Sequence, residues 1–325
     1  MSHPYDRLSP DLVLDAVESL GLHADGRVMA LNSYENRVFQ IGIEDGAGVV
    51  AKFYRPDRWS DQAILEEHAF SLALASDDIP VVAPNSYRQQ TLFRQEGFRF
   101  ALFPRRGGRA PELDNFDHLE WIGRFIGRIH LLGRAKPFTH RPSLDCQRYG
   151  WQARQAVLDS ELLPLEYRSD YETLSAQLIE DAQGHFDRAQ ARPLRLHGDC
   201  HPGNILWTDA GPHFVDMDDC CNGPAVQDLW MLLSGERRDM LMQLDAVLEG
   251  YRTFCDFDAA ELALIEPLRT LRLLHYTAWL VQRWDDPAFP AAFTWFAEAG
   301  YWPGYLADLR QQAQRMAEPP LQLLG

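Results

Sequence analysis

The chain has 325 residues, which is enough for two domains or for the two lobes of one catalytic unit. Hydrophobic residues make up 46% and charged residues 24% of the chain, which is typical of a globular protein. The chain has no run of about 18 apolar residues, the length needed to span a bilayer, so we expect no insertion into a membrane. The formal net charge of −16 repels polyanions, so we expect no nucleic-acid partner.

The first residues and the cysteines indicate where the protein works. The first residues lack a basic segment followed by an apolar one, so we expect no signal peptide and a cytoplasmic location. The cysteines are odd in number and form no C-x-x-C pair, which argues against a disulfide framework and against a redox centre. We therefore expect reduced thiols. Separately, we expect a monomer or a weak oligomer. The cysteines are Cys146, Cys200, Cys220, Cys221 and Cys255.

The pattern of the first hundred or so residues predicts short strands and two helices. Ser9 as N-cap and Pro10 at the first helical position begin a helix with an apolar stripe, and Gly21 ends it. Runs of β-type residues then predict a meander with a tight turn at 45–48, and a helix at 61–75 comes before two further strands. The expected strands are 28–31, 38–43, 49–54, 81–87 and 97–103.

The pattern changes at 104–109, where Pro and Gly interrupt it, and helical periodicity dominates from there on. This break is the predicted boundary between a β-rich N-terminal part and a helical C-terminal part. Three short strands are expected within the helical part, at 194–196, 205–207 and 213–215. The expected helices are 119–133, 150–162, 168–189, 225–234, 236–255 and 260–284.

The stretch H-G-D-C-H-P-G-N-I-L begins at residue 197, and we call residues 197–204 the His-Gly-Asp loop. Asp199 and Asn204 lie at the two ends of its turn, and a hairpin brings the chain back to Asp216, which begins the Asp turn at 216–219. Phosphoryl transfer needs one carboxylate to deprotonate the attacking hydroxyl, and an Asn and a second carboxylate to hold magnesium. Each residue alone is typical of a turn, but the joint pattern favours catalysis.

A zinc site is the alternative, because His and Cys residues cluster in the same region. Adjacent cysteines are a poor chelating pair, however, and the surrounding Asp and Asn oxygens suit magnesium better than zinc. We therefore favour magnesium. The zinc candidates would be His197, Cys200, His201, Cys220 and Cys221.

Lys52 ends a strand that otherwise consists of buried residue types, so its ammonium either reaches the surface or meets an anion. Glu67, on the next predicted helix, is the expected partner of this ammonium. Glu66 is the competing choice.

With these motifs the chain resembles, over nearly its whole length, the aminoglycoside phosphotransferase and choline kinase superfamily. The resemblance implies an α+β, bilobal, protein-kinase-like fold with ATP and Mg²⁺ as cofactors. A small N-terminal nucleotide-binding lobe of antiparallel sheet plus helix would span 1–104, and a larger, mostly helical catalytic and substrate-binding lobe would span 105–325. Besides the His-Gly-Asp loop, the similar segments are LNSYENRV at 31–38, KFYRP at 52–56, ILEEH at 64–68, NGPAVQDLW at 222–230 and EPPLQL at 318–323.

The resemblance implies roles for residues near the His-Gly-Asp loop. Asp199 would accept the proton of the acceptor hydroxyl, and Asn204 and Asp216 would bind magnesium, so Asp216 counts as catalytic and as a metal ligand. His201 either approaches the transferred phosphate or holds the loop through a backbone bond. Asp228 is expected to begin a helix and to bond the backbone of the loop.

The resemblance also implies a nucleotide site in the N-terminal lobe. Glu67 would pair with Lys52 and fix the lysine against the α- and β-phosphates, and the spacing in the superfamily favours Glu67 over Glu66. No G-x-G-x-x-G lies between the first two strands, and the loop that contains Ser33 takes its place, so Ser33 is expected to contact the nucleotide and is a candidate for autophosphorylation. Residues 100–104 would form the hinge beside adenine.

The acceptor is the open question. Resemblance over the whole chain favours a bacterial serine/threonine protein kinase that acts in a stress response, whereas the motif alone is shared with small-molecule kinases for aminoglycosides, choline or homoserine. A pseudoenzyme that works as a binding module is disfavoured because Lys52, Asp199, Asn204 and Asp216 are all present. A group of aromatic residues is expected to pack the C-terminal helices rather than to line the acceptor site. These are Trp279, Trp284, Trp295, Tyr301 and Trp302.

Overall fold

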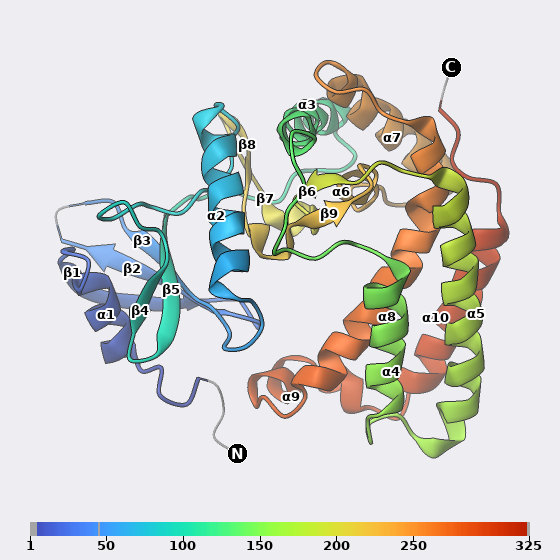
Figure 1. Ribbon diagram of the computed structural model, residues 1–325, viewed down its shortest axis with the longest axis horizontal. Coiled ribbons are helices and arrows are strands. Elements are labelled where there is room, and N and C mark those ends of the chain that lie inside the picture. The colour runs from blue at the N-terminus through green and yellow to red at the C-terminus, as the bar shows by residue number, and fades with distance from the viewer. Residues whose placement is uncertain (1–4, 45, 324–325) are drawn as a thin grey trace.

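The computed structural model of the chain describes residues 5–44 and 46–323. These residues form two lobes of an α+β fold, with an antiparallel sheet at one end and a larger group of helices at the other (Figure 1). The predicted fold class is therefore confirmed. In the described part of the chain, no helix is long and apolar enough to cross a membrane.

The N-terminal sheet has the strand order β1-β2-β3-β5-β4, and all neighbouring strands are antiparallel. The strand expected at 81–87 is wrong: Val81 and Tyr87 form isolated bridges outside the sheet, and a short strand further along the chain takes the edge position instead. Pro80 and Pro84 lack the N–H groups that a continuous ladder needs. The strands are β1 (Ala24–Leu31), β2 (Arg37–Ile43), β3 (Val49–Phe53), β4 (Phe93–Gln95) and β5 (Phe98–Pro104).

Helix α1 (Pro10–Glu18) covers this sheet. As predicted, the Ser9 hydroxyl accepts a hydrogen bond from the backbone N–H of Leu12, and Pro10 occupies the first helical turn. The buried side chains of α1 pack with sheet residues such as Phe53 in a small core of their own. The turn expected at 45–48 includes Asp45, which lies outside the described residues.

Helix α2 (Asp61–Ser76) stands between the sheet and the helical lobe (Figure 1). Ile64 packs with Tyr54 next to the sheet, whereas Phe70 and Leu74 belong to the core of the helical lobe. Because α2 contributes to both cores, it fixes the position of one lobe against the other.

The C-terminal lobe contains the predicted helices, several of them shorter than expected, and one long helix that the sequence did not predict. This helix, α10, begins at Tyr301, where Pro303 and Gly304 in its first turn hide the helical pattern. The α-helices are α3 (Phe116–Gly133), α4 (Ala153–Leu158), α5 (Leu165–Ala189), α6 (Gln227–Trp230), α7 (Arg237–Arg252), α8 (Ile265–Arg283), α9 (Ala288–Ala292) and α10 (Tyr301–Ala317).

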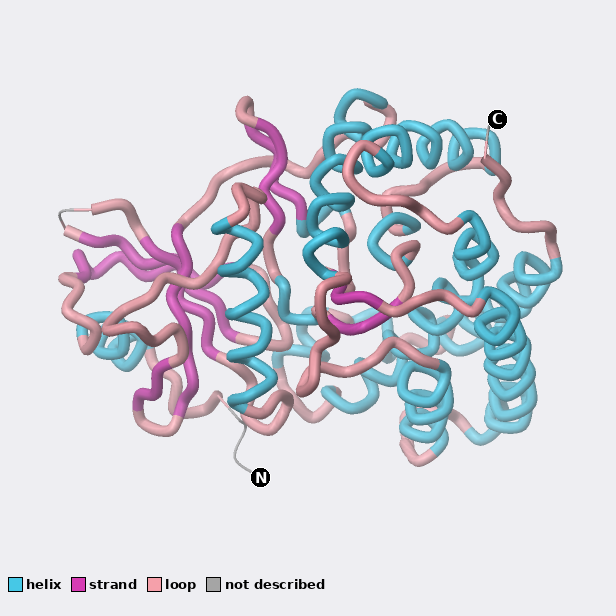
Figure 2. Tube along the Cα trace, turned by 45° about the horizontal axis from the view of Figure 1, so that its top comes forward, coloured by secondary structure: helices cyan, strands magenta, loops and turns pink. Residues whose placement is uncertain are grey.

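Two short ladders lie outside the N-terminal sheet, one of them among the helices of the C-terminal lobe (Figure 2). Strand β6 (Leu194–Leu196) pairs with β9 (Cys221–Gly223), and β7 (Ile205–Thr208) pairs with β8 (Gly211–Phe214). The predicted hairpin of β7 and β8 is confirmed. The end of β8 also pairs with the segment after α2, because the Phe214 N–H donates to the Pro80 carbonyl at 2.8 Å.

Candidate active site

The His-Gly-Asp loop rests on a buried carboxylate. Asp228, at the start of α6, accepts hydrogen bonds from the backbone N–H groups of His197 and Gly198, both at 2.8 Å. Its Oδ2 also lies 3.0 Å from Nε2 of His130 on α3. The expectation that Asp228 bonds the backbone of this loop is confirmed.

A second buried carboxylate supports α6. Glu261 is 4% exposed, and it accepts the backbone N–H of Val226 at 2.9 Å. Burial raises the pKa of Glu261 to about 7, against the opposing effect of the Val226 N–H. The residue is therefore protonated more readily in the folded protein than in the unfolded chain.

This shift predicts a stability change that depends on pH. A carboxyl whose folded pKa is raised contributes fully below its unfolded pKa of 4.5, and that contribution is lost as pH rises towards 7. Glu261→Gln keeps an acceptor for Val226 and removes the buried charge, so it should stabilise the protein at pH 8 by up to about 3 kcal/mol and have little effect at pH 4. Thermal melts at the two pH values measure this, with the exposed Glu249→Gln as control. An equal shift at both values would contradict it.

The His-Gly-Asp loop touches the Asp turn through its backbone. Gly198 has a φ of +87°, and a Cβ added there would lie 2.2 Å from the carbonyl oxygen of Asp219. Glycine is therefore required by both the left-handed conformation and the close approach. This contact holds the two segments that carry Asp199 and Asp216 side by side.

Asp199 lies in this loop with three polar neighbours. One carboxylate oxygen, Oδ1, accepts a hydrogen bond from Nη1 of Arg272 at 2.5 Å, and Nε2 of His201 lies 3.5 Å from Oδ2. The Asn204 amide donates to the backbone oxygen of Asp199 at 2.9 Å. Burial by itself would raise the pKa of Asp199, but His201 and Arg272 hold it well below its usual range. Asp199 is therefore a carboxylate at neutral pH.

Asp216 begins the Asp turn in a left-handed conformation, with a φ of 58°. Its Oδ1 accepts a hydrogen bond from the Lys52 ammonium at 3.0 Å, and its side chain is 56% exposed. Lys52 also pairs with Asp218 at 3.1 Å. Burial would lower the pKa of Lys52, but the carboxylates around it raise it well above the ordinary value. The lysine thus links β3 to the Asp turn.

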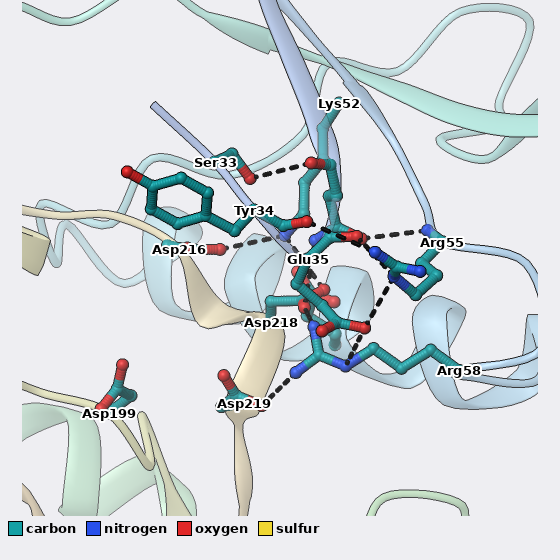
Figure 3. A network of polar contacts seen from close by, with 12 residues as sticks. Ser33, Tyr34, Glu35, Lys52, Arg55, Arg58, Asp199, Asp216, Asp218 and Asp219 are labelled. Atoms are coloured by element: carbon teal, nitrogen blue, oxygen red, sulfur yellow. Dashed lines mark hydrogen bonds and ion pairs between the residues drawn. The ribbon is translucent and has the colours of Figure 1, made fainter. Parts of the chain in front are cut away.

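Arg58 joins the Asp turn from the N-terminal lobe. Its guanidinium pairs with Asp218 and with Asp219, and it also lies 3.7 Å from Glu35 (Figure 3). The Asn36 amide donates a further hydrogen bond to Asp218 at 3.1 Å. Arg58 was not among the predicted site residues, because Asp218 and Asp219 lie about 160 residues away from it in the chain.

The expected ion pair between Lys52 and Glu67 is wrong in this structure. The Lys52 ammonium pairs with the carboxylates of Asp216 and Asp218 instead. Glu67 forms an ion pair with Arg141, at 3.9 Å. Glu67 is nevertheless close enough to Lys52 for their charges to interact: burial raises the pKa of Glu67 to about 7, and Lys52 opposes that shift.

Glu66 faces a different part of the molecule. Its carboxylate accepts backbone hydrogen bonds from Thr139, His140 and Arg141 in the helical lobe, at 2.6, 2.7 and 2.9 Å. The choice between the two glutamates therefore falls on Glu67 as the residue near Lys52, and Glu66 ties α2 to the segment at 139–141.

Arg141 is a buried residue that sequence reasoning missed. Its Nε donates to the carbonyl of Cys220 at 2.9 Å, and its Nη2 donates to the carbonyl of Asp218. The guanidinium also stacks on the ring of Trp59 at 4.1 Å. Arg141 therefore fixes the backbone of the Asp turn from behind.

The loop at 32–36 closes one side of the site. The Ser33 hydroxyl donates to the backbone carbonyl of Asn36 at 3.2 Å. Glu35 crosses to α8, where it accepts hydrogen bonds from the indole N–H of Trp279 at 2.6 Å and from Arg283 at 2.9 Å. The loop that carries Ser33 is thus attached to the helical lobe.

A cavity of about 370 Å³ lies between these elements. Its lining includes Ser33 from the loop at 32–36, Asp199, Asp216 and, on α8, Arg272 and Trp279. Trp302 is buried in the core of the helical lobe, and Trp279, Trp284 and Tyr301 pack against it as expected, but Trp279 also lines the cavity and Trp295 is exposed. The site residues Ser33, Asp199 and Asp216 therefore meet at one cavity, with Lys52 beside Asp216.

Comparison with known proteins places this site in a family. The model of the phosphotransferase enzyme family matches residues 27–265, which is more than half of the chain. The chain belongs to this family.

Two curated relatives are similar to this phosphotransferase over almost their whole length. Stress response kinase A of Escherichia coli (strain K12) is 48% identical, and serine/threonine protein kinase RdoA of Salmonella typhimurium is 46% identical; each alignment covers 98% of this chain and 97% of the relative. A solved amicoumacin kinase, in complex with AMP-PNP and Ca²⁺, shares the fold with a TM-score of 0.75 at 20% identity, over 98% of this chain and 96% of that one.

The oxygen atoms that the phosphotransferase site offers as metal ligands suit a hard divalent cation. The side-chain amide oxygen of Asn204 accepts no hydrogen bond from the described residues, and the exposed carboxylate of Asp216 uses one oxygen for Lys52. Mg²⁺ prefers oxygen ligands and commonly takes one or two from the protein and the rest from phosphates and water.

A zinc site has no such support. Within residues 5–44 and 46–323, no group of three or more His, Cys, Asp or Glu is arranged to hold a metal ion. The zinc candidates Cys200, Cys220 and Cys221 are buried free thiols, and burial raises the pKa of each.

Proposed function

We propose that this phosphotransferase is an ATP- and Mg²⁺-dependent serine/threonine protein kinase of a bacterial stress response. The observation that carries the proposal is the 48% identity with Stress response kinase A over 319 residues. The site geometry supports it: Asp199 and Asp216 line one cavity, and the Asn204 amide donates to the backbone oxygen of Asp199, so a base and two candidate magnesium ligands lie close together, as protein kinases need.

In this proposal residues 1–104 bind the nucleotide, and residues 105–325 carry the catalytic groups and the acceptor. The acceptor oxygen forms a bond to the γ-phosphorus while the bond to the β–γ bridging oxygen breaks, and ADP leaves. Asp199 takes the hydroxyl proton. Bound Mg²⁺ would neutralise charge on the phosphate oxygens, and Asn204 and Asp216 would hold it.

Lys52, Glu67 and Ser33 complete the nucleotide site in this proposal. Asp216, which pairs with Lys52 here, would serve the metal, and Lys52 would then face the α- and β-phosphates, with Glu67 as the buried carboxylate near it. Ser33 lies in the cavity lining and would contact the phosphates. Mass spectrometry of the chain after incubation with ATP tests whether Ser33 itself also accepts phosphate.

A small-molecule kinase is the second candidate. The fold shared with amicoumacin kinase favours it, and a cavity of about 370 Å³ has room for a small hydroxylated molecule. The same Asp199 would take a proton from either kind of acceptor.

The experiment is incubation with labelled ATP and Mg²⁺, with casein in one arm and a panel of hydroxylated amines in the other. Label in casein, absent for Asp199→Ala and after removal of Mg²⁺ with EDTA, supports the protein kinase. Label only in amines removes that proposal in favour of the small-molecule kinase. Equal label with Asp199→Ala would remove the site assignment.

A further inference from the structure

Arg272 holds the carboxylate that the acceptor has to reach. We propose that Arg272 selects acceptors that carry a carboxylate or a phosphate group beside the hydroxyl. The inference rests on the proposed function, because it names the acceptor class of the same site: a hydroxyl with an acidic neighbour, expected first of all in a peptide.

The position of Arg272 places it on the acceptor side of the cavity. It projects from α8, whose residues Leu268, His275, Tyr276 and Trp279 line the same cavity. Its side chain is 44% exposed, and the Nη1 that it directs at Asp199 lies 2.5 Å from Oδ1. A group that enters the cavity to meet Asp199 therefore also meets this guanidinium.

Most of the hydrogen-bonding capacity of Arg272 is unused. A guanidinium has five N–H donors, and the hydrogen bond to Asp199 is the one that Arg272 makes with residues 5–44 and 46–323. A planar fork of this kind binds a carboxylate or a phosphate through two parallel hydrogen bonds.

The other charges around the cavity are already paired. Asp218 has Lys52 and Arg58 as partners, Asp219 pairs with Arg58, and Glu35 pairs with Arg283. The side chain of Arg58 is 16% exposed and lies between its two carboxylates. Among the described residues that line the cavity, Arg272 is thus the cation whose side chain is exposed and still has N–H donors without a protein partner.

This arrangement discriminates between acceptors by charge. An acceptor with its own anion gives Arg272 a new partner, so Asp199 can turn to the hydroxyl without leaving the arginine unpaired. A neutral acceptor offers Arg272 no new partner. The ion pair between Arg272 and Asp199 then has to be broken without replacement, or it remains and keeps Asp199 from the hydroxyl. A cationic acceptor is repelled by the guanidinium.

Three peptides of the same sequence test this, with the residue beside a single serine set to Asp, Asn or Lys. We expect the wild-type chain to have the order Asp, Asn, Lys in kcat/KM, with Asp above Asn by about 10–100-fold. Arg272→Gln should lose the difference between the Asp and Asn peptides, and Arg272→Glu should turn the preference towards Lys. Arg269→Gln is the matched control, because Arg269 lies on the same helix but pairs with Glu266 away from the cavity.

The outcomes separate this inference from the protein kinase proposal. Equal kcat/KM for the three peptides in the wild type, or an Asp preference that survives in Arg272→Gln, overturns the inference and leaves the protein kinase standing. If no peptide is labelled, glycerate, glycerol and ethanolamine replace them as anionic, neutral and cationic acceptors. Transfer to glycerate that depends on Arg272 then supports the inference without the protein kinase, whereas preference for ethanolamine, or no transfer at all, overturns it.

Discussion

Asp199→Asn should lower kcat for phosphoryl transfer by about 10²–10⁴-fold, the range that one general base contributes. Asparagine has nearly the same shape but cannot take the hydroxyl proton. The Asn204 amide bonds the backbone oxygen of residue 199, at 2.9 Å, and this contact survives the change. The loop should therefore keep its conformation, and the loss should fall on the chemical step.

The measurements are single-turnover transfer from labelled ATP and calorimetric titration of ATP binding. ATP affinity should stay within about threefold of the wild type, because the proposed nucleotide contacts are those of Lys52 and the loop at 32–36. Asp209→Asn, an exposed carboxylate in the turn between β7 and β8, is the control. Retention of more than about a tenth of the activity by Asp199→Asn would assign the proton to another group.

Arg141→Gln should destabilise the protein by about 3–5 kcal/mol, because it removes one partner of a buried charge pair and leaves two backbone carbonyls without donors. It should also raise the Mg²⁺ concentration needed for half-maximal activity. The reason is geometric: the carbonyls of Asp218 and Cys220, which Arg141 binds, set the course of the turn that carries Asp216.

Arg141→Lys separates the two effects. A lysine restores the charge beside Glu67 but cannot donate to both carbonyls in the plane that a guanidinium provides. Stability should recover in part while the Mg²⁺ requirement stays high, as thermal melts and Mg²⁺ titrations of activity can show. Arg148→Gln is the control, since Arg148 also lies over the Trp59 ring, at 5.7 Å, but its side chain makes no hydrogen bond to the Asp turn among the described residues. Full recovery of both properties in the lysine variant would contradict the positioning role.

The parts of the site that sequence reasoning identified are those coded locally. Asp199 and Asn204 lie in one short loop, and a single hairpin separates them from Asp216, so the spacing of residue types already indicates their proximity. The capped start of α1 was predictable for the same reason, because Ser9 and Leu12 form the cap within one turn.

The arginines of the site could not be found in this way. Arg58, Arg141 and Arg272 meet partners that lie 160, 77 and 73 residues away, and an arginine in a loop or on a polar helix face is usually solvated. The predicted partner of Lys52 was wrong for a related reason. Several carboxylates compete for one ammonium, and local spacing does not say which of them comes closest.

The three hydrogen bonds of Glu66 set an energetic threshold for moving α2. The N-terminal end of this helix is tied to the sheet through Asp61 and Arg99, and its middle is tied to the helical lobe by Glu66. A rotation of α2 away from the helical lobe has to break all three bonds together, at about 1–3 kcal/mol each. A regulator that works by turning this helix must supply that free energy from its own binding. A ligand that competes for the cavity and leaves α2 in place does not have to break these hydrogen bonds.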